Sequence, residues 1–214
     1  MSDVHKVDAP RAVGSRPDPR PDLAQLVAAR ICHDLLSPLG AIANGVELVG
    51  LTGGPPSPEM ALIGESVEAA TARMRFFRTA YGPAARGQTV ARAEVTATLA
   101  AVARGGRLSF DWTPPDEQPR DEVRAAFLLL QCIESALPLG GHVTVSRAGE
   151  AWEVVAEGPR LRIEEAAWTA LQSPRARPPL QAALVQFALL PEALADLGRA
   201  LALKIGTDRI AARF

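Results

Sequence analysis

The sequence has few of the features that mark secreted, membrane-spanning or nucleic-acid-binding proteins. Its two cysteines, Cys32 and Cys132, form neither a disulfide framework nor a metal-ligand spacing. We interpret them as reduced thiols packed in helices of a cytosolic protein. The formal net charge of -1 gives no sign of a nucleic-acid surface held by charge. No apolar run reaches the roughly 20 residues that a membrane-spanning helix needs. We therefore expect a soluble, cytoplasmic protein.

The N-terminal segment, residues 1–21, lacks the apolar core of a signal peptide. It contains several prolines among Arg and Asp residues. Such a segment cannot bury enough surface to offset the entropy lost on ordering, so we predict a disordered tail.

Residues 22–82 have the pattern of a helical hairpin. Asp22 is a candidate N-cap, and the next residues up to Gly50 carry an apolar stripe with helical spacing, with Pro38 expected to bend the helix. A turn over 52–58 precedes a second amphipathic helix over 58–81. One hairpin cannot cover its own apolar face, so the pattern predicts a homodimer in which two hairpins form a four-helix bundle.

Residues 83–214 alternate between helical and strand-like segments, which predicts an α/β sandwich with helices on one face of a mixed sheet. The fold class of the whole chain is therefore α+β. The expected helices cover 93–104, 121–137, 163–172 and 180–197, and the expected strands cover 107–112, 142–146, 152–155, 202–205 and 209–214.

The candidate functional residue is His33, midway along the first helix. Arg30 and Ser37 share its helix face by their spacing of three and four, and Gly40 and Asn44 continue the same line. We expect this strip to be polar and exposed, with Gly40 and the next residue, Ala41, leaving room for a partner. A neutral imidazole is a competent nucleophile toward phosphorus. Arg30 could pair with phosphoryl oxygens.

The run Cys32-His-Asp-Leu-Leu-Ser-Pro-Leu39 resembles the phosphoacceptor box of sensor histidine kinases, usually His-Glu-Leu-Arg-Thr-Pro-Leu. The longer stretch 29–48 resembles the ChpT-type histidine phosphotransferases, which are dimeric hairpin proteins with a degenerate kinase-like C-terminal domain. The resemblance implies that His33 is the phosphoacceptor, Asp34 its acidic neighbour and Ser37 the hydroxyl residue of the box.

The same resemblance implies a C-terminal domain that has lost its nucleotide chemistry. Gln131 and Ser135 stand where kinases have two asparagines, of which the first serves Mg²⁺. Ala156 replaces the aspartate that reads adenine, and Arg160 replaces a glycine of the same motif. Without these groups the positioning and charge stabilisation of a nucleotide are lost together, so we expect no ATP binding and no metal or cofactor in this chain.

The resemblance also implies the partners. A receiver domain of a hybrid histidine kinase would phosphorylate His33, and response regulators, including cell-cycle regulators in this family, would remove the phosphoryl group. Mg²⁺ would be supplied by the receiver. Arg30, Gly40, Ala41 and Asn44 would form the docking surface, and neither nucleic acid nor membrane would be a partner. Two alternatives remain open: a dimeric receiver-binding scaffold without transfer, and an ATP-dependent sensor kinase.

Overall fold

The computed structural model describes residues 58–82, 84, 87–173 and 181–214, and thirteen positions of the first hairpin segment: 27, 30, 31, 34, 35, 38, 40–42, 44, 45, 48 and 49. All thirteen are helical. The predicted disordered tail and most of the turn over 52–58 lie outside the described residues. No described helix is both long enough and apolar enough to cross a membrane.

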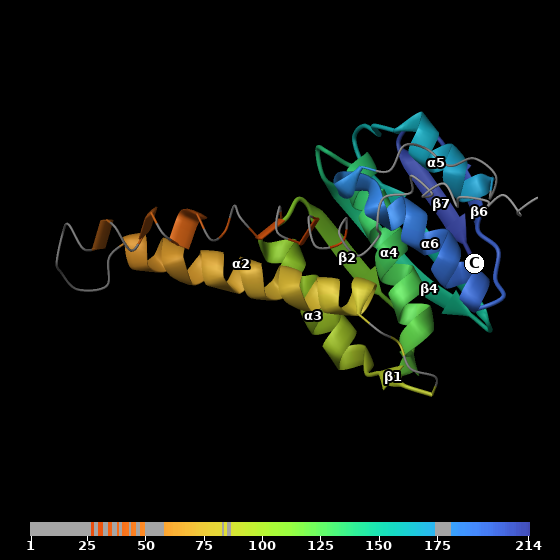
Figure 1. The fold of residues 1–214 in the computed structure, drawn as a ribbon, viewed down its shortest axis with the longest axis horizontal. Coiled ribbons are helices and arrows are strands. Elements are labelled where there is room, and N and C mark those ends of the chain that lie inside the picture. Colours follow the sequence, from red (N-terminus) through yellow and green to blue (C-terminus); the bar gives the residue numbers. More distant parts are fainter. Residues whose placement is uncertain are drawn as a thin grey trace, which may run out of the picture.

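The second hairpin helix, α2 (Pro58–Tyr81), has the bounds that the sequence predicts. It runs beside the first helical segment, and its N-terminal half projects beyond the rest of the molecule (Figure 1). The two helices approach closely at Gly45, which is buried: a Cβ there would overlap Ile63 and lie 3.2 Å from the carbonyl oxygen of Glu59. Glycine therefore sets the spacing of the hairpin at this level.

The C-terminal half contains a five-stranded mixed sheet in the order β2-β4-β5-β7-β6. Only the β2–β4 pair is parallel, and α4 lies in the connection between these two strands. Gly149, with a φ of 62°, helps to form the tight turn between β4 and β5. The strands are β2 (Leu108–Trp112), β4 (Gly141–Ala148), β5 (Ala151–Glu157), β6 (Ala202–Ile205) and β7 (Arg209–Arg213).

Four helices accompany this sheet, and α4, α5 and α6 cover one of its faces (Figure 1). Alternate residues of β4 and β5, from Val143 to Ala156, point into the core beneath them, as the period of two requires. A short 3₁₀ turn (Ala182–Leu184) leads into α6. The helices are α3 (Arg92–Arg104), α4 (Arg120–Ala136), α5 (Glu165–Gln172) and α6 (Val185–Asp196).

The expected α+β architecture is confirmed, and most expected elements of this half are present with ends shifted by one or two residues. The helix expected over 180–197 differs more, because α6 begins only at Val185, after the 3₁₀ turn. The sequence analysis missed a two-stranded sheet made of β1 (Thr89–Val90) and β3 (Gln118–Pro119). Two residues are too few to show an alternating pattern, and Pro119 argues against a strand by itself.

Candidate functional site

The strip predicted around His33 is only partly visible. His33 and Ser37 lie outside the described residues. Gly40 and Asn44 are exposed and Ala41 is half-buried, and a Cβ at Gly40 would meet nothing within 4 Å. This part of the helix therefore has the open surface that the sequence predicts, and the docking role assigned to it remains a prediction.

The sequence analysis expected Arg30, at the other end of the strip, to be exposed, but Arg30 and the nearby Asp34 are both largely shielded from solvent. Their side chains form an ion pair at 2.9 Å between Nη2 and Oδ2 and are only 19% and 13% exposed. Arg30 Nη1 also donates to the carbonyl oxygen of Ala183, at 3.4 Å. The difference arises because the segment leading into α6 lies against this part of the hairpin, a tertiary contact that helix periodicity does not contain.

Arg73 of α2 continues this polar region toward α4. Its guanidinium makes two contacts with the carboxylate of Glu134, one of them 3.0 Å between Nη1 and Oε2, in the paired geometry that favours Arg–carboxylate binding. Burial alone would lower the pKa of Arg73, but the hydrogen bond and charge of Glu134 outweigh it and the pKa is raised. Asp34 raises the pKa of Arg73 further, so the Arg30–Asp34 pair lies within electrostatic range of the Arg73–Glu134 pair.

Tyr81, the last residue of α2, donates its hydroxyl to Oε1 of Gln131. Gln131 is only 2% exposed, and its Nε2 has no hydrogen-bond partner among the described residues. Burial raises the pKa of Tyr81 well above its usual range, and Arg30 opposes part of that rise. The phenol is therefore a neutral donor at physiological pH, and it faces Gln131, which the sequence analysis compared with the Mg²⁺-binding asparagine of kinases.

The structure also describes the other three positions that the sequence analysis compared with nucleotide-binding residues of kinases, Ser135, Ala156 and Arg160. Ser135 Oγ donates to the carbonyl oxygen of Cys132 within α4, at 2.6 Å. Ala156 is completely buried on β5, while Arg160 is exposed in the segment that follows. Among the described residues, no group of three or more His, Cys, Asp or Glu side chains could hold a metal ion. These positions offer neither a carboxylate for adenine nor a ligand set for Mg²⁺.

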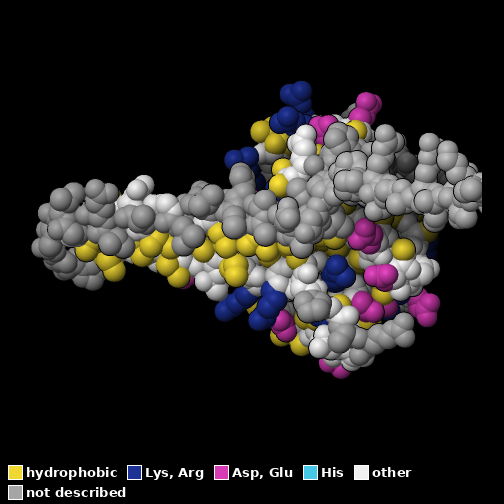
Figure 2. Space-filling view, in the orientation of Figure 1, with side chains coloured by type: hydrophobic (Ala, Val, Ile, Leu, Met, Phe, Trp, Pro, Cys, Tyr) yellow, Lys and Arg dark blue, Asp and Glu magenta, His cyan; other side chains and the backbone are white. Residues whose placement is uncertain are grey.

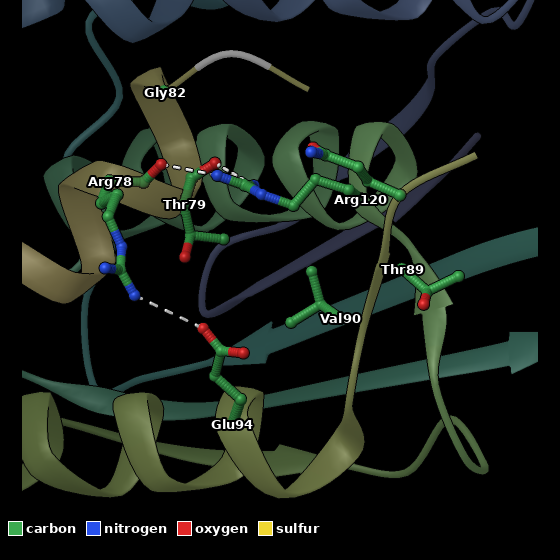
Figure 3. Close-up of a pocket in the computed structure, with 8 residues that line it drawn as sticks. Arg78, Thr79, Gly82, Thr89, Val90, Glu94 and Arg120 are labelled. Atoms are coloured by element: carbon green, nitrogen blue, oxygen red, sulfur yellow. Dashed lines mark hydrogen bonds and ion pairs between the residues drawn. The ribbon is translucent and has the colours of Figure 1, made fainter. Parts of the chain in front are cut away.

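A cavity of about 470 Å³ lies at the C-terminal end of α2, between this helix, β1 and α3 (Figure 3). Arg120 of α4 points across it and donates to the carbonyl oxygens of Arg78 and Thr79, at 2.6 and 2.7 Å. Burial lowers the pKa of Arg120, and the charges of Arg124 and Arg78 lower it further against the effect of Glu94. Arg120 thus caps the negative end of α2 and ties it to α4.

The sequence analysis did not identify Arg73, Tyr81 or Arg120 as site residues. A signal for Arg73 was available, since it lies three, four and seven residues before Phe76, Phe77 and Ala80, all of which are buried. An arginine on the buried side of an amphipathic helix requires a partner. The identity of that partner, Glu134, depends on the packing of two helices far apart in sequence.

Comparison with known proteins finds similar proteins by family, by sequence and by structure. Residues 92–209 match the family model described as "Histidine phosphotransferase C-terminal domain". The "Protein phosphotransferase ChpT" of Brucella abortus (strain 2308) is 35% identical over 130 residues, which cover 60% of this chain and 62% of that relative, less than two thirds of its length. A solved bacterial phosphotransferase is 27% identical, with a TM-score of 0.74 over 89% of this chain and 94% of that one.

Proposed function

Because the chain belongs to the histidine phosphotransferase family, we propose that it carries a phosphoryl group on His33 between receiver-domain aspartates of a two-component phosphorelay. The observation that carries this proposal is the order of the two parts: a helix with a phosphoacceptor-like box precedes a domain that matches the family over 92–209. The donor would be the receiver of a hybrid kinase, and the acceptors would be cytoplasmic response regulators, including regulators of the cell cycle.

The proposed transfer needs only a neutral imidazole in this chain. A ring nitrogen of His33 attacks the phosphorus of a receiver's aspartyl phosphate, so that a P–N bond forms while the P–O bond to the aspartate breaks. The second transfer reverses these steps on another receiver. Mg²⁺ bound by the receiver's own carboxylates would neutralise the phosphoryl oxygens.

The described residues also support transfer without ATP. The side chain at the first asparagine position, Gln131, contacts Tyr81, and Ser135 bonds to its own helix. Ala156 has no polar group with which to read a base. A nucleotide would therefore find neither metal coordination nor base recognition at the positions that kinases use.

Homodimerisation forms part of the proposal. Met60, Val67 and Met74 recur every seven residues on α2, and each is about half exposed. Figure 2 shows hydrophobic side chains gathered along this helix. A contiguous apolar stripe of this kind is typical of a surface that a partner covers, and a second hairpin would supply a matching stripe. Leu48 and Leu62 add further exposed apolar area to the hairpin.

A transfer assay tests the proposal. Purified receiver domains charged with radiolabelled acetyl phosphate are mixed with the full chain, and separate samples receive phosphoramidate or ATP with Mg²⁺. We expect label from receivers and from phosphoramidate but not from ATP. His33→Ala should abolish labelling, whereas His142→Ala should not, because His142 is 45% exposed on the open face of the sheet. Labelling of the His33→Ala protein would refute the assignment.

The docking residues need a variant that blocks a partner without disturbing the fold. Gly40→Trp suits this purpose because the surroundings of Gly40 are open. We expect the variant to accept label from phosphoramidate, a small donor, but to lose transfer from receivers. Equal transfer from receivers to the variant and the wild type would move the docking surface elsewhere.

A further inference from the structure

The hairpin and the C-terminal domain are joined by a polar cluster of six side chains, which we name the polar clamp: Arg30, Asp34, Arg73, Tyr81, Gln131 and Glu134. We propose that the polar clamp is a positioning device that fixes the C-terminal domain against the hairpin, so that a receiver meets both at a set distance from residue 33. This inference rests on the proposed function, because it assigns the clamp a role in receiver recognition.

The clamp links the relevant elements directly. Arg73 and Glu134 join α2 to α4, and Tyr81 and Gln131 join the same two helices at a second point. Both side chains of the Arg73–Glu134 pair are less than one third exposed, at 24% and 29%. A pair so shielded from water is more strongly coupled than one on the surface. Rotation of the C-terminal domain on the hairpin would break both contacts.

Arg30 extends the clamp to the part of the chain that flanks residue 33. It pairs with Asp34 on its own helix and reaches the backbone of Ala183 before α6. Arg30 and Asp34 stand on either side of residue 33 in the sequence. Arg30, three residues before the proposed phosphoacceptor and paired with Asp34, therefore contacts the C-terminal domain, which is why a change in domain position would be felt at the transfer site.

Energetics indicate that the clamp serves arrangement more than stability. Apolar side chains of similar volume often stabilise a fold as well as a buried ion pair does, because the charges lose their hydration. Phe76, between Arg73 and Tyr81 on α2, already packs on Phe127 of α4 with ring centroids 4.7 Å apart. Apolar contact thus holds α2 to α4, and the polar groups add direction, since hydrogen bonds and ion pairs are satisfied in one arrangement only.

Gln131 shows how the degenerate site fits this role. It occupies the position that resembles the metal-binding asparagine of kinases, and its amide oxygen accepts the Tyr81 hydroxyl from the hairpin. A residue type that lost a ligand role has become part of a contact between domains. The clamp therefore gives the retained kinase-like domain a use that needs no nucleotide.

The test exchanges the charges of the clamp. Full-length Arg73→Glu, Glu134→Arg and the double variant are assayed with the fastest receiver donor of the panel and with phosphoramidate. Each single variant should raise the KM for the receiver about three- to tenfold. Labelling by phosphoramidate should stay unchanged, and the double variant should recover a low KM. The matched control exchanges Arg78 and Glu94, a pair 3.6 Å apart that is 74% and 58% exposed, and should change nothing.

Hydrogen exchange gives a reading that is independent of transfer. In the single variants, amides of 181–196 should exchange about three- to tenfold faster, and the double variant should restore protection. An unchanged KM with unchanged exchange would overturn the inference, as would slower phosphoramidate labelling, which indicates damage to the hairpin itself. A wild-type chain that takes label from no donor would refute the proposed function, and hydrogen exchange would still decide whether the clamp holds the domains.

Discussion

The hairpin and the C-terminal domain differ in what covers their apolar side chains. From Ala125 to Ile133, α4 is buried on every side, between α2, α6 and the sheet. In α2, by contrast, Met60, Val67 and Met74 remain about half exposed within the single chain.

The difference bears on the proposed homodimer. The sheet and its helices bury most of their large apolar residues, with Leu139 (65% exposed) and Ile205 (37% exposed) as exceptions, as a complete folding unit does. The projecting half of α2 has apolar residues that the described part of the same chain leaves uncovered. The proposed dimer would therefore use the stripe on α2, and the C-terminal domain would not need to take part.

The largest expected effect on stability comes from disrupting the core of the C-terminal domain. Trp152 is fully buried, stacks on Phe214 with centroids 6.0 Å apart, and donates its indole N–H to Glu122 at 2.6 Å. Trp152→Ala should lower the free energy of unfolding by about 3–5 kcal/mol, through lost packing and a cavity. Urea denaturation followed by circular dichroism measures the change. Trp152→Phe is the control, because it keeps a ring, and a loss as large as that of Trp152→Ala would contradict the packing argument.

The next largest effect should appear in the dimer Kd and not in the stability of the single chain. Val67→Glu places a charge on the outer stripe of α2, where the single chain leaves Val67 46% exposed. Within a dimer the carboxylate would be buried without a partner, so the dimer Kd should rise by about a hundredfold or more. Analytical ultracentrifugation measures the dissociation.

The control for this prediction is Glu65→Lys. Two residues are separated by about 200° around a helix, so the exposed Glu65 lies nearly opposite Val67. The control should remain dimeric, and both variants should keep the thermal stability of the single chain. If Val67→Glu stays dimeric, the outer stripe is not the dimer interface.

The fold was predictable because its elements carry strong local patterns. The bounds of α2 follow from an apolar period of 3.6 between a proline-rich turn and Gly82-Pro83. The strands of the sheet could be predicted because apolar and polar residues alternate between turns such as the one at Gly149. The pairing of β1 with β3 had no such pattern, since Thr89 pairs with Pro119 only because tertiary contacts fold the chain back over 30 residues.

The site was predictable to a smaller extent. The box around His33 is a local motif, so its resemblance to a phosphoacceptor box could be read from the sequence, and the role of His33 stays a prediction. That Gln131 would face Tyr81, or that Arg30 would reach Ala183, depends on how two domains pack. No spacing within a single helix encodes such contacts, which is why Arg30 was expected to lie on an open surface.

The smallest expected effect on stability concerns the hydroxyl of Tyr81, which joins the hairpin to the C-terminal domain. Tyr81→Phe removes the hydrogen bond to Gln131 and leaves the amide oxygen without that donor. The free energy of unfolding at neutral pH should fall by about 0.5–1.5 kcal/mol, the usual contribution of a single hydrogen bond. Urea denaturation of the variant beside the wild type measures it, and an increase in stability would contradict the contact.

The same residue allows a pH-dependent test, because the phenol of Tyr81 should titrate differently in the folded and the unfolded chain. Tyr81 is the sole tyrosine of the sequence, so the near-ultraviolet absorbance of phenolate reports one group. Burial raises its pKa, so the folded chain should show no titration near the ordinary value of about 10, whereas the urea-unfolded chain should. Above that pH the unfolded state loses a proton that the folded state keeps. Stability should then fall by up to about 1.4 kcal/mol per pH unit, a contribution that is fully present below pH 10 and absent from Tyr81→Phe.

Arg30 lowers this pKa and Glu134 raises it, so Arg30→Gln should move the titration upward and Glu134→Gln downward. A folded phenol that titrates near 10 in all three proteins would show that Tyr81 is not held between the hairpin and α4.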